Sequence, residues 1–365
     1  MIRLIRPYVT FEEMEGDFRE ILGSGWLTRG PYVARFRECI TQHTGAGHTF
    51  LTTSATTALT LCLKLLGVGS GDEVIVADFS FPASANVVED LGAIPIFADV
   101  DAATYNMSPD ALEATITPRT KAVIFVDALG NPSGLPEIAR RCFSHSIPLI
   151  EDAACALGSS VGGVACGSIA DMSCFSFHPR KLVTTGEGGA LTVRDASHAA
   201  WLERRLNHGA IAVNGVQDFV DYGYNFRMSE LQAAMGVRQL QRLDAIIAGR
   251  QEIRELYIAR LVPTGFIPQH LAADVHYNTQ SVVFRVPDDC QRDVLIADLG
   301  DQGIESTLGT YCLSLCSYYR KKYDDVQPVA KMLQETTIAL PCYDGVDVET
   351  VCVAINQAIG SYRRT

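Results

Sequence analysis

The sequence predicts an α/β protein in which a large, mostly parallel sheet is followed by a smaller α+β domain. Between about residues 50 and 195, short runs rich in β-branched residues alternate with helical segments, which is typical of a parallel sheet. After residue 260 this alternation stops. The length of 365 residues is enough for two domains, and a hydrophobic fraction of 47% is ordinary for a globular protein. We therefore place a large domain at residues 1–249 and a small α+β domain at residues 250–365.

The predicted strands of the large domain consist almost entirely of apolar residues. Strands buried on both faces have this composition, because helices cover both sides of a parallel sheet. Helical segments such as 58–66 and 109–116 separate the strands. The predicted strands are 73–77, 94–97, 122–126, 147–150 and 174–177.

The helices predicted between residues 196 and 260 are long and amphipathic. In the segment 230–243, Leu231, Met235 and Leu240 recur at helical spacing. The small domain then contains a strand at 281–286 and a helix at 292–300, and a helix at 348–361 closes the chain.

The charge and the cysteines argue against several function classes. Thirty Lys and Arg against 42 Asp and Glu give a net charge of −12, which disfavours binding to nucleic acid or to an anionic membrane. The start of the chain lacks the apolar region of a secretory signal, and no stretch reaches the ~18 apolar residues of a membrane span. Eleven cysteines without a CxxC pair indicate reduced, buried thiols rather than a metal site. We expect a cytoplasmic protein without a bound metal.

Chemically useful residues follow the predicted strands. Phe81, Asp127, Asp152 and Lys181 come shortly after four different strands. Ligands of open parallel sheets bind beyond the carboxyl ends of the strands, so we expect these side chains to converge at one edge. Any one of the aspartates could instead start a loop or cap a helix.

The helix that begins at Ser54-Ala-Thr-Thr-Ala58 is a candidate phosphate site. Small hydroxyl residues at a helix start leave free backbone N–H groups, which bind phosphate well. This pattern is weak alone, because Ser and Thr cap many helices that bind no ligand.

Lys181 differs from the other five lysines of the chain. It lies between the end of a strand and the glycine-rich turn 184–189, where the backbone can approach a ligand closely. A lysine amine that is buried in an apolar pocket or lies near another cation loses its proton and becomes a nucleophile. Schiff-base chemistry requires such an amine.

Together these features match the needs of pyridoxal 5'-phosphate (PLP). The cofactor needs a phosphate cup, a lysine for its aldehyde, a carboxylate on its pyridine nitrogen and a flat group on its ring. Residues 54–57 with Ser176 would form the cup, and Lys181 would bind the aldehyde. Asp152 would keep the ring nitrogen protonated, and Phe81 would stack on the ring.

In the order and spacing of its motifs, the chain resembles the DegT/DnrJ/StrS family of nucleotide-sugar aminotransferases, which belongs to fold-type I of the PLP-dependent transferases. The resemblance covers nearly the whole chain, from residue 25 to the closing helix. It implies a PLP-dependent aminotransferase. The matching motifs are 53–58, 71–76, 118–122, 151–154, 176–181, 186–189, 207–209, 223–227 and 230–234.

The resemblance also implies a role for each matching site residue. Lys181 would be the Schiff-base lysine and the proton shuttle, with Asp152 on the pyridine nitrogen and Phe81 on the ring. Asn225, with Arg227, would reach the phosphate region of the neighbouring subunit, so the resemblance implies a homodimer with shared active sites. The phosphate of the same subunit's cofactor would be held by Ala55, Thr56 and Ser176.

Two positions depart from the family pattern. Cys155 stands where relatives often have Gln or His, and Asp127 stands where they often have His. A thiol is a poorer hydrogen-bond partner for the cofactor hydroxyl near Cys155, although a water or a neighbouring group could fill that role.

For the reaction, the resemblance implies an amino donor, L-glutamate, that converts PLP to pyridoxamine phosphate, which then aminates a keto-sugar on a nucleoside diphosphate. The stretch 27–31 resembles the branch that acts on 4-keto sugars more than the 3-keto branch. Candidate substrate contacts are Thr28, Arg29, His208, Arg227 and Tyr311. For Tyr311, ordinary packing in the small domain is an equally good interpretation.

The sequence disfavours three alternative functions. A sugar 3-dehydratase on the same scaffold would carry His in place of Lys181. A PLP-binding regulatory protein without turnover would need a DNA-reading helix and a less acidic surface to act on DNA. A cysteine desulfurase would need a catalytic thiol on a mobile loop, which nothing in the sequence marks.

Overall fold

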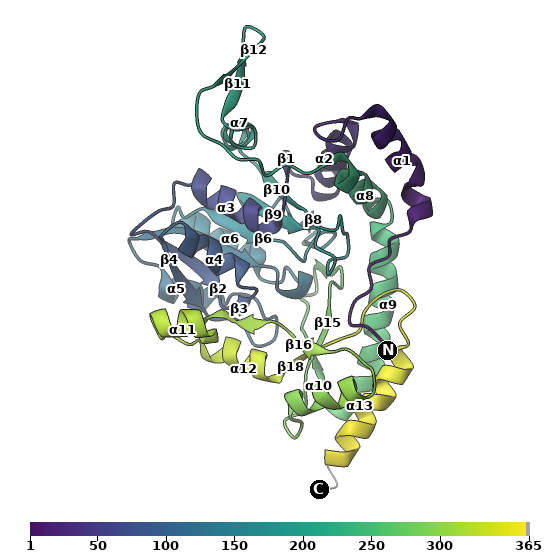
Figure 1. The fold of residues 1–365 in the computed structure, drawn as a ribbon. Helices are drawn as coiled ribbons and strands as arrows, with labels where there is room; N and C mark the ends of the chain where they lie inside the picture. The colour runs from purple at the N-terminus through teal and green to yellow at the C-terminus, as the bar shows by residue number, and fades with distance from the viewer. Residues whose placement is uncertain (363–365) are drawn as a thin grey trace.

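A seven-stranded sheet forms the centre of the protein in the computed structural model, which describes residues 1–362 (Figure 1). The strand order is β1-β10-β9-β6-β5-β2-β4. The run from β9 to β4 is parallel, β10 is antiparallel to β9, and β1 is antiparallel to β10. The prediction of a mostly parallel sheet is confirmed. The strands are β1 (His48–Thr52), β2 (Glu73–Ala77), β4 (Ile94–Ala98), β5 (Thr120–Val126), β6 (Leu149–Asp152), β9 (Met172–Ser176) and β10 (Gly189–Val193).

Both faces of this sheet are buried under helices, which explains the apolar strands. Side chains alternate between the faces, so Val74 and Val76 pack on one side while Ile75 packs on the other. The first face is covered by α3 (Ala55–Leu65), α4 (Ala83–Asp90) and α7 (Ala196–Arg205). The second face is covered by α5 (Pro109–Thr115), α6 (Leu135–Ser144), α2 (Pro31–Thr44) and α8 (Glu230–Leu240).

The helix predicted over residues 230–243 is two helices in the structure. The first, α8, ends at Leu240, and α9 (Leu243–Leu261) begins two residues after Gln241. The predicted domain boundary at residues 249 and 250 falls inside α9, which is continuous across it.

The smaller part of the molecule is built on a four-stranded antiparallel sheet with the order β13-β15-β18-β16. Its core is shared with α9, α10 (Arg292–Asp301) and α13 (Val348–Tyr362). The first residues of the chain also lie here, because Ile2 pairs with Ile304. Residues 363–365 of the predicted small domain lie outside the described residues. The strands are β13 (Ile267–Pro268), β15 (Val282–Arg285), β16 (Thr307–Leu308) and β18 (Thr337–Leu340).

Segments near the C-terminus return to the large sheet. The strand β17 (Tyr311–Cys312) pairs with β3 (Phe79–Ser80), which directly follows β2. The helices α11 (Ser317–Tyr323) and α12 (Pro328–Thr336) pack into the cores on the two faces of the large sheet. A small sheet of β14 (Val275–His276), β7 (Ser160–Val161) and β8 (Val164–Ala165) forms a further link between the two parts.

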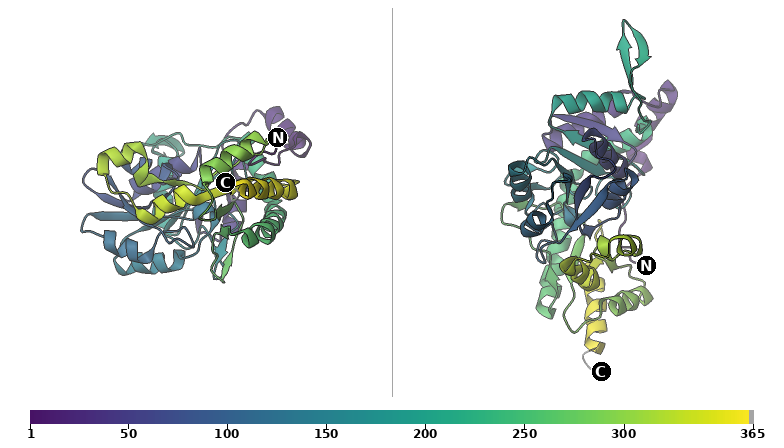
Figure 2. Two further views of the ribbon diagram at one scale, coloured as in Figure 1. Left: turned by 90° about the horizontal axis from the view of Figure 1, so that it is seen from below. Right: turned by 90° about the vertical axis from the view of Figure 1, so that its left-hand side faces the viewer.

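A hairpin of β11 (Ala210–Val213) and β12 (Val216–Phe219) projects from one end of the molecule, opposite the end where the C-terminus lies (Figures 1 and 2). Several of its apolar side chains are exposed: Val213, Val216 and Phe219 are 44%, 69% and 62% exposed. The helix α1 (Phe11–Ser24) lies beside α8 on the main body. Within residues 1–362, no helix has the length and apolar character needed to cross a bilayer.

Candidate active site

The carboxyl ends of the parallel strands bring most of the predicted cofactor residues to one edge. Asp152 is the last residue of β6 and pairs with Cys174 of β9, two residues before Ser176. Ser176 in turn faces Gly189, the first residue of β10. Parallel strands in register must present their carboxyl ends together, so the expected convergence holds for these positions.

Asp152 is a buried carboxyl group that is held from two sides. Its Oδ2 accepts a hydrogen bond from Ser84 Oγ at 2.7 Å, and its Oδ1 accepts one from the Ala154 N–H at 3.3 Å. Burial raises the pKa of Asp152 above its ordinary value, while the hydrogen bond from Ser84 and the charge of Lys181 act in the opposite direction. A buried carboxylate of this kind is stabilised by a cationic partner. The protonated pyridine nitrogen of PLP is such a cation.

Lys181 lies on the loop between β9 and β10 and is partly buried. Its Nζ donates a hydrogen bond to Sγ of Cys155 at 3.0 Å. Its charge also acts on Asp152. The amine therefore lies beside the buried carboxyl group rather than in open solvent, as Schiff-base chemistry requires.

Two side chains that the sequence did not mark hold the Lys181 loop and the neighbouring Cys155 backbone. Gln280 accepts a hydrogen bond from the Leu182 N–H and donates one to the Arg180 carbonyl at 2.7 Å. Asn278 donates to the carbonyl of Cys155 at 2.8 Å. Both residues precede β15 of the small sheet, so that segment fixes the distance between Lys181 and Cys155.

Gly130 allows this close approach. A Cβ at Gly130 would lie 2.4 Å from Oδ1 of Asn278 and 2.7 Å from the Cys155 carbonyl oxygen, and its φ of +97° favours glycine. Both contacts join residues that lie far apart in the sequence, so no local pattern marks Gly130 for this role.

The N-terminus of α3 forms a cradle suited to a phosphate group. The Ser54 side chain accepts a hydrogen bond from the Thr57 N–H in a capping box. The N–H groups of Ala55 and Thr56 lie in the first turn, where the helix offers them no carbonyl acceptor, so they can bind a ligand. Gly189 packs directly against this turn: a Cβ there would lie 2.3 Å from the Ser54 carbonyl carbon. With Ser176 next to Gly189, the cradle is the one predicted for PLP.

Phe81 and Tyr311 lie together at the edge of the same region. The Phe81 ring is 65% exposed and meets the Tyr311 ring edge to face at 6.3 Å between centroids. Tyr311 is brought there because β17 pairs with β3. The alternative interpretation of Tyr311, as ordinary packing within the small domain, is therefore wrong, because Tyr311 pairs with Ser80 beside the large sheet.

A buried carboxylate holds this returning segment in place. Asp78 accepts hydrogen bonds from the Ser314 N–H at 2.7 Å, from Ser314 Oγ at 2.6 Å and from Cys312 Sγ at 3.2 Å. Burial raises the pKa of Asp78 to about 6, although these hydrogen bonds lower it.

The other predicted substrate residues gather in a second place. Arg29 and Arg227 line a cavity of about 270 Å³ that includes neither Lys181 nor Asp152. Arg29 donates to Asn207, next to the exposed His208, and Thr28 forms a bridge with Ser229.

Two of the three arginines of this second cavity, Arg29 and Arg227, form no ion pair with a carboxylate among residues 1–362, whereas Arg37 lies 4.0 Å from Glu203. Burial and the charge of Arg29 lower the pKa of Arg227. Within residues 1–362, the buried Nη1 of Arg227 has no hydrogen-bond partner. Guanidinium groups in this state are suited to binding an anion from outside the chain.

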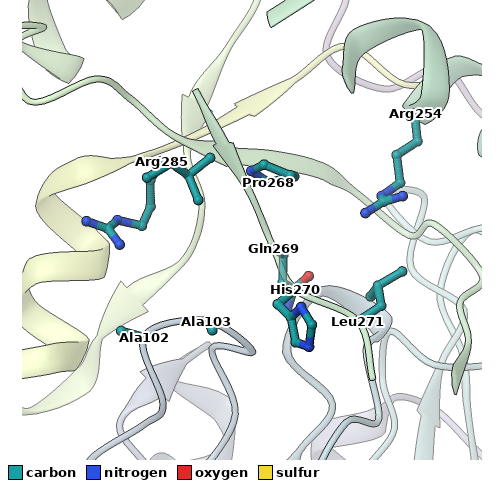
Figure 3. A pocket seen from close by; sticks show the side chains of 9 residues that line it. Ala102, Ala103, Arg254, Pro268, Gln269, His270, Leu271 and Arg285 are labelled. Carbon is teal, nitrogen blue, oxygen red and sulfur yellow. The ribbon is translucent and has the colours of Figure 1, made fainter. Parts of the chain in front are cut away.

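Asn225 is exposed on the irregular segment between β12 and α8. Another cavity, of about 650 Å³, lies where the loop after β4 meets β13 and β15 (Figure 3). It is lined by Arg254, His270 and Arg285 among others and contains none of the predicted site residues.

Comparison with known proteins agrees with this geometry. Residues 10–357 match the model of the DegT/DnrJ/EryC1/StrS aminotransferase family. GDP-perosamine synthase from Caulobacter vibrioides is 32% identical over 98% of this chain and 100% of its own length.

Solved structures show the same likeness. The aminotransferase TlmJ from Streptoalloteichus hindustanus has a TM-score of 0.93 and 33% identity over 99% of both chains. Spr1654 from Streptococcus pneumoniae, solved in a PLP form and a PMP form, has a TM-score of 0.89 in its PLP form and 28% identity over 98% of both chains. The chain is therefore a PLP-dependent enzyme of fold-type I and belongs to the DegT/DnrJ/EryC1/StrS aminotransferase family.

Proposed function

We propose that this enzyme transfers an amino group from L-glutamate to a keto-sugar carried on a nucleoside diphosphate, and that the keto group is at C4 of the sugar. The observation that carries the proposal is the contact of the Lys181 amine with Cys155, beside the buried carboxyl of Asp152. The similarity to GDP-perosamine synthase supports a nucleotide-linked sugar. The resemblance of residues 27–31 to the 4-keto branch supports the position.

Asp152, Ser84 and the start of α3 are the residues that would hold PLP in this site. When bound, PLP supplies an electron sink that stabilises a carbanion next to the nitrogen being transferred. Asp152 would keep the ring nitrogen protonated, and the hydrogen bond from Ser84 to Oδ2 favours the ionised form of Asp152. The N–H groups of Ala55 and Thr56, with Ser176, bind the phosphate.

Lys181 has two tasks in this proposal. Its Nζ would bind the cofactor aldehyde, and its amine would carry the proton that is exchanged during the transfer. The Phe81 ring would cover one face of the cofactor, and the adjacent Tyr311 ring would lie at the entrance for the sugar.

We further propose a cytoplasmic homodimer in which each subunit completes the other's site. The exposed apolar hairpin supports it, because apolar side chains such as Val216 and Phe219 are commonly covered by a partner. Asn225, Arg227 and Arg29 would supply amide and guanidinium groups to phosphates of the partner's cofactor or substrate. The unpaired Nη1 of Arg227 is the observation behind this role.

The experiment separates donor, acceptor and cofactor chemistry. Wild-type protein with PLP is mixed with L-glutamate alone, and the conversion of PLP to pyridoxamine phosphate is followed by absorbance. A panel of nucleotide-linked 4-keto and 3-keto sugars is then added and the aminated product is detected by mass spectrometry. Conversion with glutamate and product from the 4-keto sugars is expected. Conversion without any sugar product would contradict the acceptor, and no conversion would contradict the donor.

A further inference from the structure

The interior behind the proposed cofactor site contains two carboxyl groups with too few hydrogen-bond donors. Asp127 follows β5 and Glu151 lies in β6, and both side chains are completely buried. Oε2 of Glu151 accepts hydrogen bonds from Ser173 Oγ at 2.5 Å and from the Gly167 N–H at 2.9 Å. Among the atoms of the described chain, Oε1 of Glu151 and both carboxyl oxygens of Asp127 have no partner.

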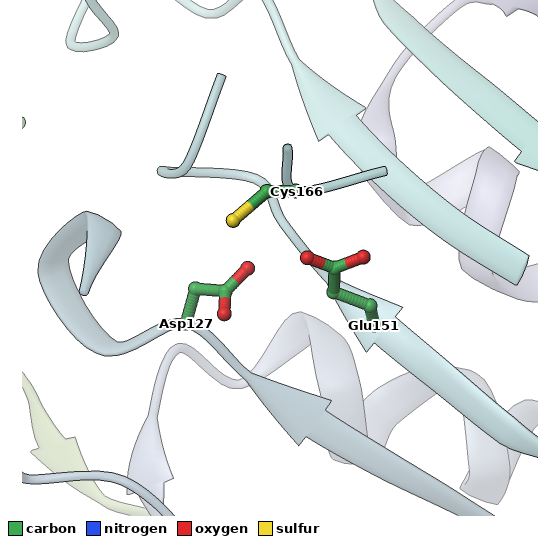
Figure 4. Close-up of side chains that lie close together, drawn as sticks. All are labelled: Asp127, Glu151 and Cys166. Atoms are coloured by element: carbon green, nitrogen blue, oxygen red, sulfur yellow. The ribbon is translucent and has the colours of Figure 1, made fainter. Parts of the chain in front are cut away.

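The two carboxyl groups point toward each other, and the thiol of Cys166 points toward Asp127 (Figure 4). One oxygen of each carboxyl and the Sγ of Cys166 all lie within 4.8 Å of one another. The ionisable groups that raise the pKa of Asp127 most are Glu151, Asp152 and Cys155, and Cys166 also interacts with Asp127; none of these is a cation. The charge of the nearby Lys181 amine lowers the pKa of Asp152. Two ionised carboxylates at this distance in a dry interior would repel each other strongly.

We propose that Asp127 and Glu151 share one proton, which Asp127 carries and donates to Oε1 of Glu151. Glu151 keeps the negative charge because two donors already stabilise its Oε2. Asp127 keeps the proton because it has no donor to stabilise an ionised form. One proton thereby converts an unsatisfied pair into a hydrogen-bonded one.

The pair acts on the cofactor site through the backbone. The Asp127 N–H donates to the carbonyl oxygen of Asp152 at 3.2 Å, so the pair lies directly behind the carboxyl that would face PLP. Asp127 is therefore a positioning residue, and the proton on it keeps a further negative charge away from Asp152. This inference about the pair stands independently of the proposed sugar substrate.

The shared proton links stability to pH in a definite direction. Burial and the charge of Glu151 raise the pKa of Asp127 well above its ordinary value. In the unfolded chain both carboxyl groups lose their protons near pH 4, whereas the native pair keeps one. The stability that this proton contributes is complete below the unfolded pKa and is lost as the pH rises through the folded pKa. In that interval the native state binds one proton more than the unfolded state, so the unfolding constant rises about tenfold per pH unit.

The test compares wild type with Asp127→Asn, both saturated with PLP, by denaturant unfolding at pH 5, 6, 7 and 8. The Asn side chain donates an N–H to Glu151 as the acid does, but it takes up no proton. We expect the stability of Asp127→Asn relative to wild type to increase steadily with pH, by about tenfold in the unfolding constant per unit. Parallel stability curves from pH 5 to pH 8 would overturn the proposal.

A control and a second variant keep the test decisive. Asp288→Asn removes an exposed carboxyl and is expected to leave the pH dependence of wild type unchanged. Glu151→Gln still accepts from Ser173 and Gly167 and donates an N–H to Asp127. It also removes the negative charge that, together with burial, raises the pKa of Asp127, so the one-proton dependence is expected to end at a lower pH than in wild type. This variant answers the question if Asp127→Asn does not fold. A one-proton dependence that extends to the same pH in a folded Glu151→Gln protein as in wild type would overturn the proposal.

Two carboxylates and a thiol could instead hold a divalent metal, and the same proteins distinguish this. Zn²⁺ added to chelator-treated wild type is expected to leave its unfolding midpoint unchanged. A midpoint that rises with Zn²⁺ in wild type but not in Asp127→Asn would replace the shared proton by a metal site.

Discussion

Ser84 provides a direct way to perturb Asp152 without touching the cofactor. The hydroxyl donates to Oδ2 of Asp152 at 2.7 Å, and both side chains are buried. Hydrogen bonds to buried charged groups contribute about 1.5–3 kcal/mol. Ser84→Ala removes this donor, so the pKa of Asp152 is expected to rise further and the carboxylate that pairs with the ring nitrogen becomes less available.

The expected loss is roughly 10- to 100-fold in PLP affinity, since 1.4 kcal/mol corresponds to a factor of ten. The assay is a titration of apo-protein with PLP followed by absorbance, at pH 6 and pH 8. The loss should be larger at pH 6 than at pH 8, because the further rise in the pKa of Asp152 leaves less of the group ionised at the lower pH. Ser80→Ala is the matched control, since Ser80 Oγ contacts Ser84 Oγ at 3.3 Å but makes no contact with Asp152. Equal PLP affinity in Ser84→Ala and wild type would refute the reasoning.

Three further changes test other parts of the site. Gly189→Ala places a Cβ 2.3–2.6 Å from backbone atoms of Ser54 and Ala55. We therefore expect thermal unfolding at a lower temperature and a PLP affinity reduced by more than tenfold. Unchanged values in both assays would contradict the role of this turn in binding the phosphate. Asn278→Ala removes the donor to the Cys155 carbonyl, and we expect kcat to fall more than KM rises, whereas a pure KM effect would contradict a role in placing Lys181. Phe219→Asp puts a charge on the exposed hairpin, so we expect analytical sedimentation to show monomers. A dimer as stable as that of wild type would show that the hairpin does not lie in the dimer interface.

Much of the site was predictable because it depends on strand ends. Asp152 and Ser176 end apolar runs, and Lys181 follows one closely, so local patterning located them. Ser84 was not predictable as the partner of Asp152, because 68 residues separate the two and a serine in a helix carries no mark of its acceptor. The same holds for Gln280, which contacts the Lys181 loop, and for Asn278, which contacts the Cys155 backbone, because both contacts depend on where the small sheet lies.

The fold shows the same division between local and distant information. The parallel strands were predicted from their apolar composition, but the return of Tyr311 to the large sheet was not. That return depends on Asp78, whose hydrogen bonds to Ser314 span 236 residues. The break between α8 and α9 was also missed, because Leu240 and Leu243 keep helical spacing across it.

The most direct test of the account is to locate the cofactor on the chain. Protein loaded with PLP is reduced with borohydride and digested, and the peptides are sequenced by mass spectrometry. We expect a phosphopyridoxyl group on Lys181 and on none of the other five lysines. The label on a different lysine, or a cofactor-loaded protein that takes no label, would contradict it.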